Sequence, residues 1–144
     1  MKITIQQNEV QDELEIVIHC KEIDGQVSEL VSALSNLDRK LTGTKDGRTF
    51  VLDLRDIFYF ESVDKKTFAY SESAVYEVSP RLYELENSLP RDFFRASKAA
   101  IINISKIKSI MPYFNGRLEV ALINGERLIV SRQYTQGLKT KLGL

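Results

Sequence analysis

The stretch Phe93-Phe94-Arg95-Ala96-Ser97-Lys98-Ala99-Ala100-Ile101-Ile102-Asn103 decides how the fold of this chain is interpreted. Its ends are apolar and favour burial, whereas its middle carries two cations and a hydroxyl group. The backbone must therefore leave the core and return within a few residues. Such a connection holds polar side chains outward on a rigid scaffold, where binding residues tend to lie. An ordinary solvated loop has a similar composition, so the rest of the chain has to decide between the two interpretations.

Length and composition predict a single domain, or a domain of about 100 residues with a short appendage. The chain has 144 residues, of which 43% are hydrophobic, which is enough for a core. No basic segment followed by an apolar one opens the sequence, and the apolar runs are too short to span a bilayer. The single cysteine, Cys20, excludes an internal disulfide and fits a reducing compartment. We therefore expect a cytoplasmic protein.

Charge is distributed unevenly along the chain, although the formal net charge is zero. Residues 1–90 carry 10 basic and 17 acidic side chains, a net charge of −7, whereas residues 91–144 carry 10 basic and 3 acidic side chains, a net charge of +7. A basic half is the expected footprint of a surface that binds phosphates.

Residues 1–40 are predicted to form two strands and a helix. The segments 2–6 and 13–20 alternate in polarity as strands do. Asp24 can cap a following helix, in which one apolar stripe consists of Val27, Leu30, Val31, Leu34 and Leu37. This stripe must pack on the neighbouring strands or on a second copy of the protein.

The remainder of the chain reads as short strands separated by turns. Asp46-Gly47, Asn115-Gly116 and Asn124-Gly125 are typical of tight β-hairpins, because such turns need positive φ at their centre. Asp64-Lys65-Lys66 marks a further turn. About nine or ten strands result, which predicts a mainly β, antiparallel fold.

Two more short helices are expected in this part of the chain. Ser79-Pro80 is typical of a helix start, with Ser79 as the cap and Pro80 at the first helical position, and Pro90 ends that helix. Ser131 can cap a final helix over residues 133–142, whose inner face carries Tyr134, Leu138 and Leu142.

The sequence gives little support for an enzyme. The only histidine, His19, precedes Cys20 on the opposite face of a predicted strand, so a buried thiol and a surface histidine are expected rather than a catalytic pair. Asp53 and Asp56 are interpreted as turn residues. No spacing typical of a metal site or of a phosphate-binding glycine loop occurs. We expect no catalytic residue, metal, cofactor or small-molecule substrate.

Basic residues recur where predicted strands end. They are Lys65, Lys66, Arg95, Lys98, Lys106, Lys108 and Arg132. Each alone is consistent with a solvated surface charge. Together they match a surface that reads DNA with loops, because lysine and arginine contact phosphates and arginine can pair with guanine.

A series of short motifs resembles the LytTR family of bacterial DNA-binding domains over roughly residues 41–144. The motifs are, in order, residues 56–62 (DIFYFES), 82–90 (LYELENSLP), 93–103 (FFRASKAAIIN), Ile107 with Ile110, and 130–134 (VSRQY). Their combination and spacing are specific, whereas any one of them would be weak.

The resemblance implies an elongated, mostly antiparallel β-fold of about ten strands with short helices, preceded by the strand-strand-helix segment. Its loops would enter successive major grooves without a helix-turn-helix. Base-reading side chains would come from the Lys66-Thr67 turn, from Ser97-Lys98 and from Arg132. Arg95 and Lys106 are expected on phosphates, and Asn103 is expected to hold its loop through backbone hydrogen bonds. The predicted DNA-binding set is Lys65, Lys66, Thr67, Arg95, Ser97, Lys98, Asn103, Lys106, Arg132 and Tyr134.

The chain departs from the family pattern in two respects. Many members have His-Arg-Ser where this chain has Ser97-Lys98-Ala99, so a lysine replaces a guanidinium fork at the centre of the loop. Many also have a receiver domain, for which residues 1–40 are too few. We therefore expect a stand-alone transcription regulator that binds promoter DNA as a homodimer, with a DNA-binding domain over residues 41–144 and a dimerisation or partner segment over residues 1–40. A small membrane protein that holds it inactive is a plausible partner by the same resemblance.

A second function stays open at this stage. The acidic first half and the apolar stripe of the predicted helix also fit a protein-interaction module whose N-terminal segment binds a regulatory partner, with weak or no DNA binding.

Overall fold

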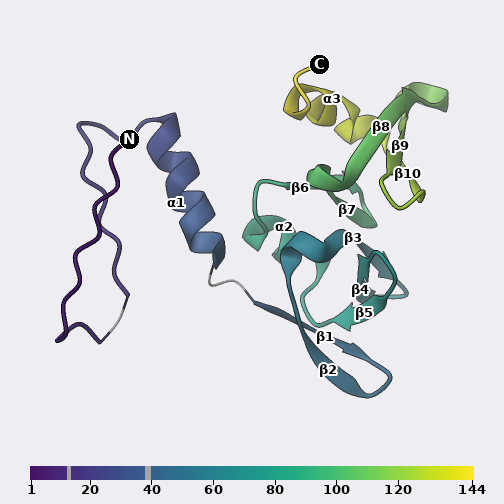
Figure 1. The fold of residues 1–144 in the computed structure, drawn as a ribbon. Helices are drawn as coiled ribbons and strands as arrows, with labels where there is room; N and C mark the ends of the chain where they lie inside the picture. The colour runs from purple at the N-terminus through teal and green to yellow at the C-terminus, as the bar shows by residue number, and fades with distance from the viewer. Residues whose placement is uncertain (13, 38–39) are drawn as a thin grey trace.

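A computed structural model describes residues 1–12, 14–37 and 40–144 (Figure 1). One helix, α1 (Gly25–Leu37), precedes a domain of ten strands and two further α-helices. Its strands are β1 (Leu41–Lys45), β2 (Arg48–Leu52), β3 (Ile57–Val63), β4 (Lys66–Ser71), β5 (Val75–Val78), β6 (Phe93–Ser97), β7 (Ala100–Asn103), β8 (Ile107–Pro112), β9 (Leu118–Leu122) and β10 (Arg127–Val130). The helices of this domain are α2 (Leu82–Ser88) and α3 (Arg132–Lys141).

The strands form two antiparallel sheets. The larger has the order β2-β1-β5-β4-β3-β7-β6, and the smaller has the order β10-β9-β8. The backbone N–H of Ser131 donates to the carbonyl of Ala96 at 2.9 Å, which joins the end of the smaller sheet to β6 of the larger one. The prediction of a mainly β, antiparallel fold is confirmed.

The tight turns follow from residues that tolerate a left-handed backbone. Asp46 and Gly47 have φ of 52° and 76° and join β1 to β2, as predicted. Asp64 and Lys65 have φ of 51° and 66° and join β3 to β4 without a glycine. Two central residues with positive φ match the twist of the flanking strands.

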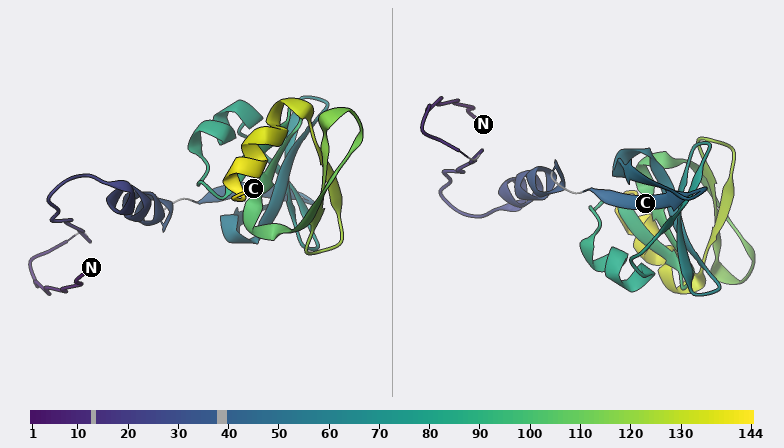
Figure 2. Two further views of the ribbon diagram at one scale, coloured as in Figure 1. Left: turned by 90° about the horizontal axis from the view of Figure 1, so that it is seen from above. Right: turned by 90° about the horizontal axis from the view of Figure 1, so that it is seen from below.

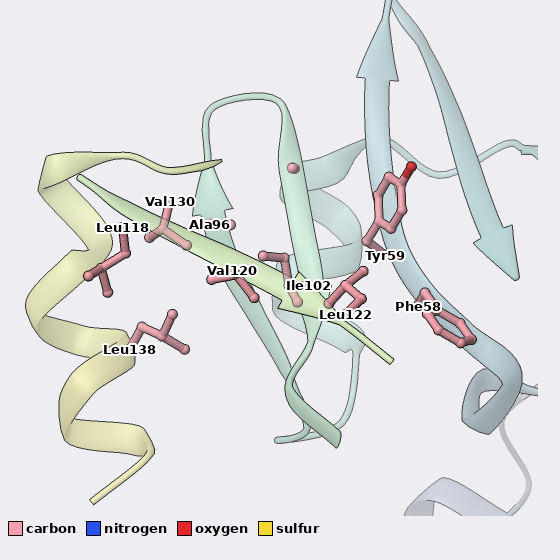
Figure 3. Packing of buried hydrophobic residues seen from close by; sticks show 10 residues of the cluster. Phe58, Tyr59, Ala96, Ile102, Leu118, Val120, Leu122, Val130 and Leu138 are labelled. Carbon is pink, nitrogen blue, oxygen red and sulfur yellow. The ribbon is translucent and has the colours of Figure 1, made fainter. Parts of the chain in front are cut away.

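The core lies on both faces of the larger sheet. Ile101 and Ile102 are neighbours on β7 and point to opposite faces, because successive strand side chains alternate. Ile101 packs with residues of α2, including Leu85, whereas Ile102 packs with the smaller sheet and with Leu138 of α3 (Figure 3). Burial on both faces explains why the β3 and β7 sequences are nearly continuous apolar runs.

The N-terminal strands predicted from alternation are not found. Residues 2–6 and 14–20 form no strand, and residue 13 lies outside the described residues. Ile5 and Leu14 are each 89% exposed, because no neighbouring strand or helix covers these segments. Alternation alone cannot hold two short strands together in water. Cys20 is exposed rather than buried.

Helix α1 forms as predicted, and Asp24 accepts a hydrogen bond from the N–H of Val27 at 3.0 Å. It stands beside the β domain in both views of Figure 2. No helix in the described part of the chain has both the length and the apolar character needed to cross a membrane.

Helix α2 begins later than predicted. Its first residue is Leu82 and its cap is Arg81, whose backbone N–H donates to Oε1 of Glu84 at 3.3 Å. Ser79 and Pro80 therefore belong to the connection after β5. The side chain of Glu84, three residues after the cap, satisfies a free N–H at the later position.

Candidate nucleic-acid interface

Two turns of the larger sheet lie at the same end of the domain. Glu61 of β3 pairs with Ala100 of β7, and the N–H of Ser62 donates to the carbonyl of Ala99 at 2.8 Å. The β3–β4 turn with Lys65 and Lys66 therefore extends past the same sheet end as the β6–β7 turn with Lys98.

The start of α3 joins these turns. Because Ser131 is hydrogen-bonded to Ala96, the first residue of the helix, Arg132, lies beside the β6–β7 turn. Both segments line one open groove, formed by Ser97, Lys98, Ala99, Ser131, Arg132 and Gln133. We call the surface with Lys65, Lys66, Lys98 and Arg132 the basic end.

All four cations of the basic end are exposed. None of them forms an ion pair with another described residue. Arg132 also lies at the N-terminus of a ten-residue helix, where free backbone N–H groups favour anions. The basic end is thus suited to phosphates and to the acceptor groups of bases.

The β8–β9 turn lies at the same end of the domain. The sequence did not predict that this turn belongs to the site. Val130 pairs with Leu118, so the turn before Leu118 lies next to Arg132. A Cβ added to Gly116 would meet Cγ of Arg132 at 3.0 Å. Asn115-Gly116 predicted the hairpin, but the sequence holds no signal for its approach to Arg132.

Aromatic side chains accompany this turn. The guanidinium of Arg117 lies 4.8 Å from the ring centroid of Tyr113, and its Nε donates to the carbonyl of Phe114 at 2.9 Å. Phe114 itself is 74% exposed. The turn therefore places an exposed ring on a connection that is fixed by Arg117.

Arg95 has a different environment from the other cations. Its Nε donates to the carbonyl of Ser97 at 2.6 Å, its Nη2 donates to the carbonyl of Lys98 at 2.8 Å, and its Nη1 pairs with Oε2 of Glu86 at 2.8 Å. Only 16% of its side chain is exposed. Each nitrogen of the guanidinium already has a protein acceptor.

Three residues predicted to bind DNA are buried or partly buried. Thr67 is 5% exposed within the larger sheet, and Tyr134 packs against the core. Asn103 is 2% exposed, donates from Nδ2 to the carbonyl of Ile57 and accepts from Ser105. Asn103 therefore forms hydrogen bonds with the backbone of Ile57 and Ser105, at the end of β7 remote from the Lys98 turn that it was expected to hold. The sequence predicted the elements that carry these residues without revealing which neighbours cover them.

Lys106 is also separated from the basic end. It follows Asn103, so a four-residue strand, roughly 13 Å long, lies between it and the Lys98 turn. Its Nζ lies 5.1 Å from the ring centroid of Phe58. We call the surface formed by residues 53–56 and 103–106 the Asn103 end.

An ion pair at the Asn103 end illustrates how its charges are satisfied locally. Nη2 of Arg55 lies 2.7 Å from Oδ2 of Asp53, and both side chains are largely solvated. Hydrogen bonds from the Arg55 side chain and backbone lower the pKa of Asp53 from 3.8 to about 2. The positive charge of Arg55 is therefore matched by a neighbouring carboxylate.

Curated relatives match the whole chain. Transcriptional regulators named as uncharacterized and HTH-type, from Staphylococcus aureus strains MSSA476 and MW2, are each 28% identical over 146 residues, which covers 100% of this chain and 99% of each relative. The name HTH-type does not describe the fold found here: wherever the structure describes the chain, strands separate the α-helices, so no helix-turn-helix pair occurs.

Solved structures and family models match the β domain. The LytTr DNA-binding domain of a Bacillus cereus protein, named as a methyl-accepting/DNA response regulator, superimposes with a TM-score of 0.69 and 29% identity and covers 73% of this chain and 97% of that domain. The family model of the LytTr DNA-binding domain matches residues 47–143. The chain therefore belongs to the LytTr DNA-binding domain family.

Proposed function

We propose that the protein is a transcription regulator that binds double-stranded DNA sequence-specifically through its basic end. The observation that carries this proposal is the convergence of two exposed cations, Lys98 and Arg132, on one groove. The family match supports the DNA-binding activity, and the names of the relatives support the regulatory role. Such a role requires access to the chromosome and hence a cytoplasmic location.

The cations of the basic end would contact different groups of the DNA, according to the chemistry of each side chain. Arg132 presents a planar fork, which pairs bidentately with O6 and N7 of guanine in the major groove. Lys98, at the tip of its turn, offers a single ammonium to a base acceptor. Lys66, the first residue of β4, takes the third base contact, and Lys65, inside the β3–β4 turn, contacts a phosphate. Thr67, Asn103 and Tyr134 shape the fold in this proposal.

Residues 1–40 would serve association, with residues 41–144 as the DNA-binding domain. Helix α1 keeps Val27, Leu30 and Leu34 only partly buried and Val31 46% exposed. A dimer would cover this stripe and present two basic ends to two half-sites. Sizing of the full chain and of a chain starting at Leu41 tests this: an unchanged monomeric size would remove the association role. A small membrane protein that inhibits the regulator stays a prediction from the family resemblance.

Selection of bound duplexes from a random pool, at a stated salt concentration, tests the DNA-binding function. Salt must be fixed because the phosphate contribution to affinity falls steeply as salt rises. We expect one motif to be enriched by the full chain, and a weaker or altered motif to be enriched by Lys98→Ala. Failure to enrich any motif would favour the protein-interaction module instead.

A further inference from the structure

The guanidinium of Arg95 ties the β6–β7 turn to helix α2. Two of its nitrogens hold the carbonyls of Ser97 and Lys98, and the third pairs with Glu86. Glu86 belongs to α2, which is fixed on the sheet by the buried Leu82 and Leu85. The turn is thus anchored to a packed helix through one side chain.

The turn needs such an anchor because its own ladder is interrupted. The pairing of β6 with β7 shifts register between Arg95 and Ser97. Beyond the shift, Oγ of Ser97 accepts from the N–H of Ala99 at 3.2 Å. A bulge of this kind leaves backbone groups without strand partners, and the carbonyl of Ser97 finds its partner in Arg95.

We propose that Arg95, held by Glu86, is a positioning residue that fixes the Lys98 turn for DNA recognition. The inference rests on the proposed function of Lys98, and it replaces the phosphate contact expected of Arg95. A phosphate-binding cation needs its charge open to solvent, whereas the side chain of Arg95 is 16% exposed and already paired.

The geometry requires arginine. One planar fork reaches two successive carbonyls and a carboxylate from a single position. A lysine at this position keeps the charge but places only one ammonium, which cannot hold all three acceptors in these directions. A phosphate contact, in contrast, depends mainly on charge, so a lysine would preserve much of it.

The test compares Arg95→Lys, Arg95→Ala and Glu86→Ala with Lys98→Ala in the full chain. The matched control is Arg55→Lys, because Arg55 also pairs with a carboxylate but lies at the Asn103 end. Affinity for the duplex selected by the wild type is measured over a range of salt. Amide hydrogen exchange of Ala99 is measured on the free proteins, together with thermal unfolding.

Positioning predicts that Arg95→Lys lowers affinity about tenfold, nearly as much as Arg95→Ala, while Arg55→Lys changes nothing. The slope of log affinity against log salt concentration stays as in the wild type. Loss of a phosphate contact would make this slope shallower by about 0.9. Amide exchange at Ala99, whose N–H donates to Oγ of Ser97, becomes faster in both Arg95 variants and in Glu86→Ala. When Lys98→Ala is already present, adding Arg95→Lys lowers DNA affinity by less than about threefold, because the effect of Arg95 on binding acts through Lys98.

Two results overturn the inference. Wild-type affinity of Arg95→Lys, with a shallower salt slope for Arg95→Ala, would assign Arg95 to phosphate. Unchanged amide exchange in the Arg95 variants would show that the turn does not depend on it. If the wild type selects no duplex, the proposed function fails by itself, and the exchange measurement on free protein still decides whether Arg95 holds the turn.

Discussion

The two ends of the β domain both carry arginine, lysine and carboxylate side chains, but the cations have different partners at the two ends. At the basic end, Lys98 and Arg132 are exposed and form no ion pair with a described residue, while Arg95 behind the β6–β7 turn pairs with Glu86. At the Asn103 end, Arg55 is paired with Asp53, and Lys106 lies over an aromatic ring.

In the proposed interface, the exposed cations keep their charge free for phosphates and bases. A cation paired with a neighbouring carboxylate has less charge to offer a ligand, because the two opposite charges largely cancel each other's field at a distance. Substitutions at the two ends should therefore change different measurements.

Among the variants compared, Asn103→Ala should have the largest effect, and we expect this effect on the stability of the fold. It removes the donor to the carbonyl of Ile57 and the acceptor for Ser105 inside the fold. The buried carbonyl of Ile57, left without a partner, should lower the free energy of unfolding by about 1 to 3 kcal/mol, measured in urea. Asn124→Ala, which loses one turn hydrogen bond to the N–H of Glu126, is the control and should cost under about 1 kcal/mol. Full stability of Asn103→Ala with impaired DNA binding would contradict the assignment of Asn103 to the fold.

Arg132→Ala should produce the largest effect on DNA. Loss of a bidentate contact to a base should cost about 1 to 3 kcal/mol of binding to the selected duplex and relax the preference at one base pair. Urea unfolding should change little, because the side chain of Arg132 is exposed. Equal binding of Arg132→Ala and wild type to that duplex would remove Arg132 from the interface.

Sequence patterns predicted those features of the fold that depend on local geometry. The turns at residues 46–47 and 115–116 and the cap at Asp24 follow from residues within a few positions of one another. The stretch from Phe93 to Asn103 does turn outward at Lys98 and return into the core. Its apolar ends and polar middle were sufficient for that prediction.

Contacts between distant segments were not predictable in the same way. The burial of Thr67 depends on strands on both sides, and the partners of Arg95 depend on where α2 packs. The N-terminal alternation had the pattern of strands but no neighbouring sheet. Pattern specifies which face of an element is apolar, whereas the neighbour that covers the face is set by the whole fold.

Gly116→Ala should separate backbone strain from contact with Arg132. Gly116 has φ of 73°, and its new Cβ would press on the stem of Arg132. We expect a loss of about 1 kcal/mol in stability from the left-handed backbone and a several-fold loss in DNA affinity. Gly125→Ala is the matched control, since φ is 91° there and nothing lies within 4 Å of the added Cβ. Gly125→Ala should lower stability without changing DNA affinity. Equal DNA affinities of Gly116→Ala and Gly125→Ala would show that the β8–β9 turn does not contribute to DNA binding.

Lys106→Ala should have a small effect on DNA affinity, in contrast to Lys65→Ala. Loss of the contact with Phe58 should cost about 0.5 to 1 kcal/mol of stability. The slope of log affinity against log salt concentration should stay unchanged for Lys106→Ala, whereas Lys65→Ala should reduce it by about 0.9, the loss expected for one phosphate contact. A reduced slope for Lys106→Ala would extend the DNA surface to the Asn103 end, as the sequence had suggested.

Arg55→Ala should leave DNA affinity unchanged and act only on the titration of Asp53. The hydrogen bonds from Arg55 hold the pKa of Asp53 at about 2 instead of 3.8. A lowered pKa in the folded state favours folding above pH 3.8, and this contribution is lost as the pH falls toward 2. Without the Arg55 side chain, the pKa of the carboxyl group should rise toward 3.8, as followed by NMR, although the backbone N–H at position 55 still donates to it. The loss of stability between pH 3.8 and 2 should become correspondingly smaller. A drop in DNA affinity at neutral pH would show that charge at the Asn103 end reaches the ligand, and the distinction between the two ends would then fail.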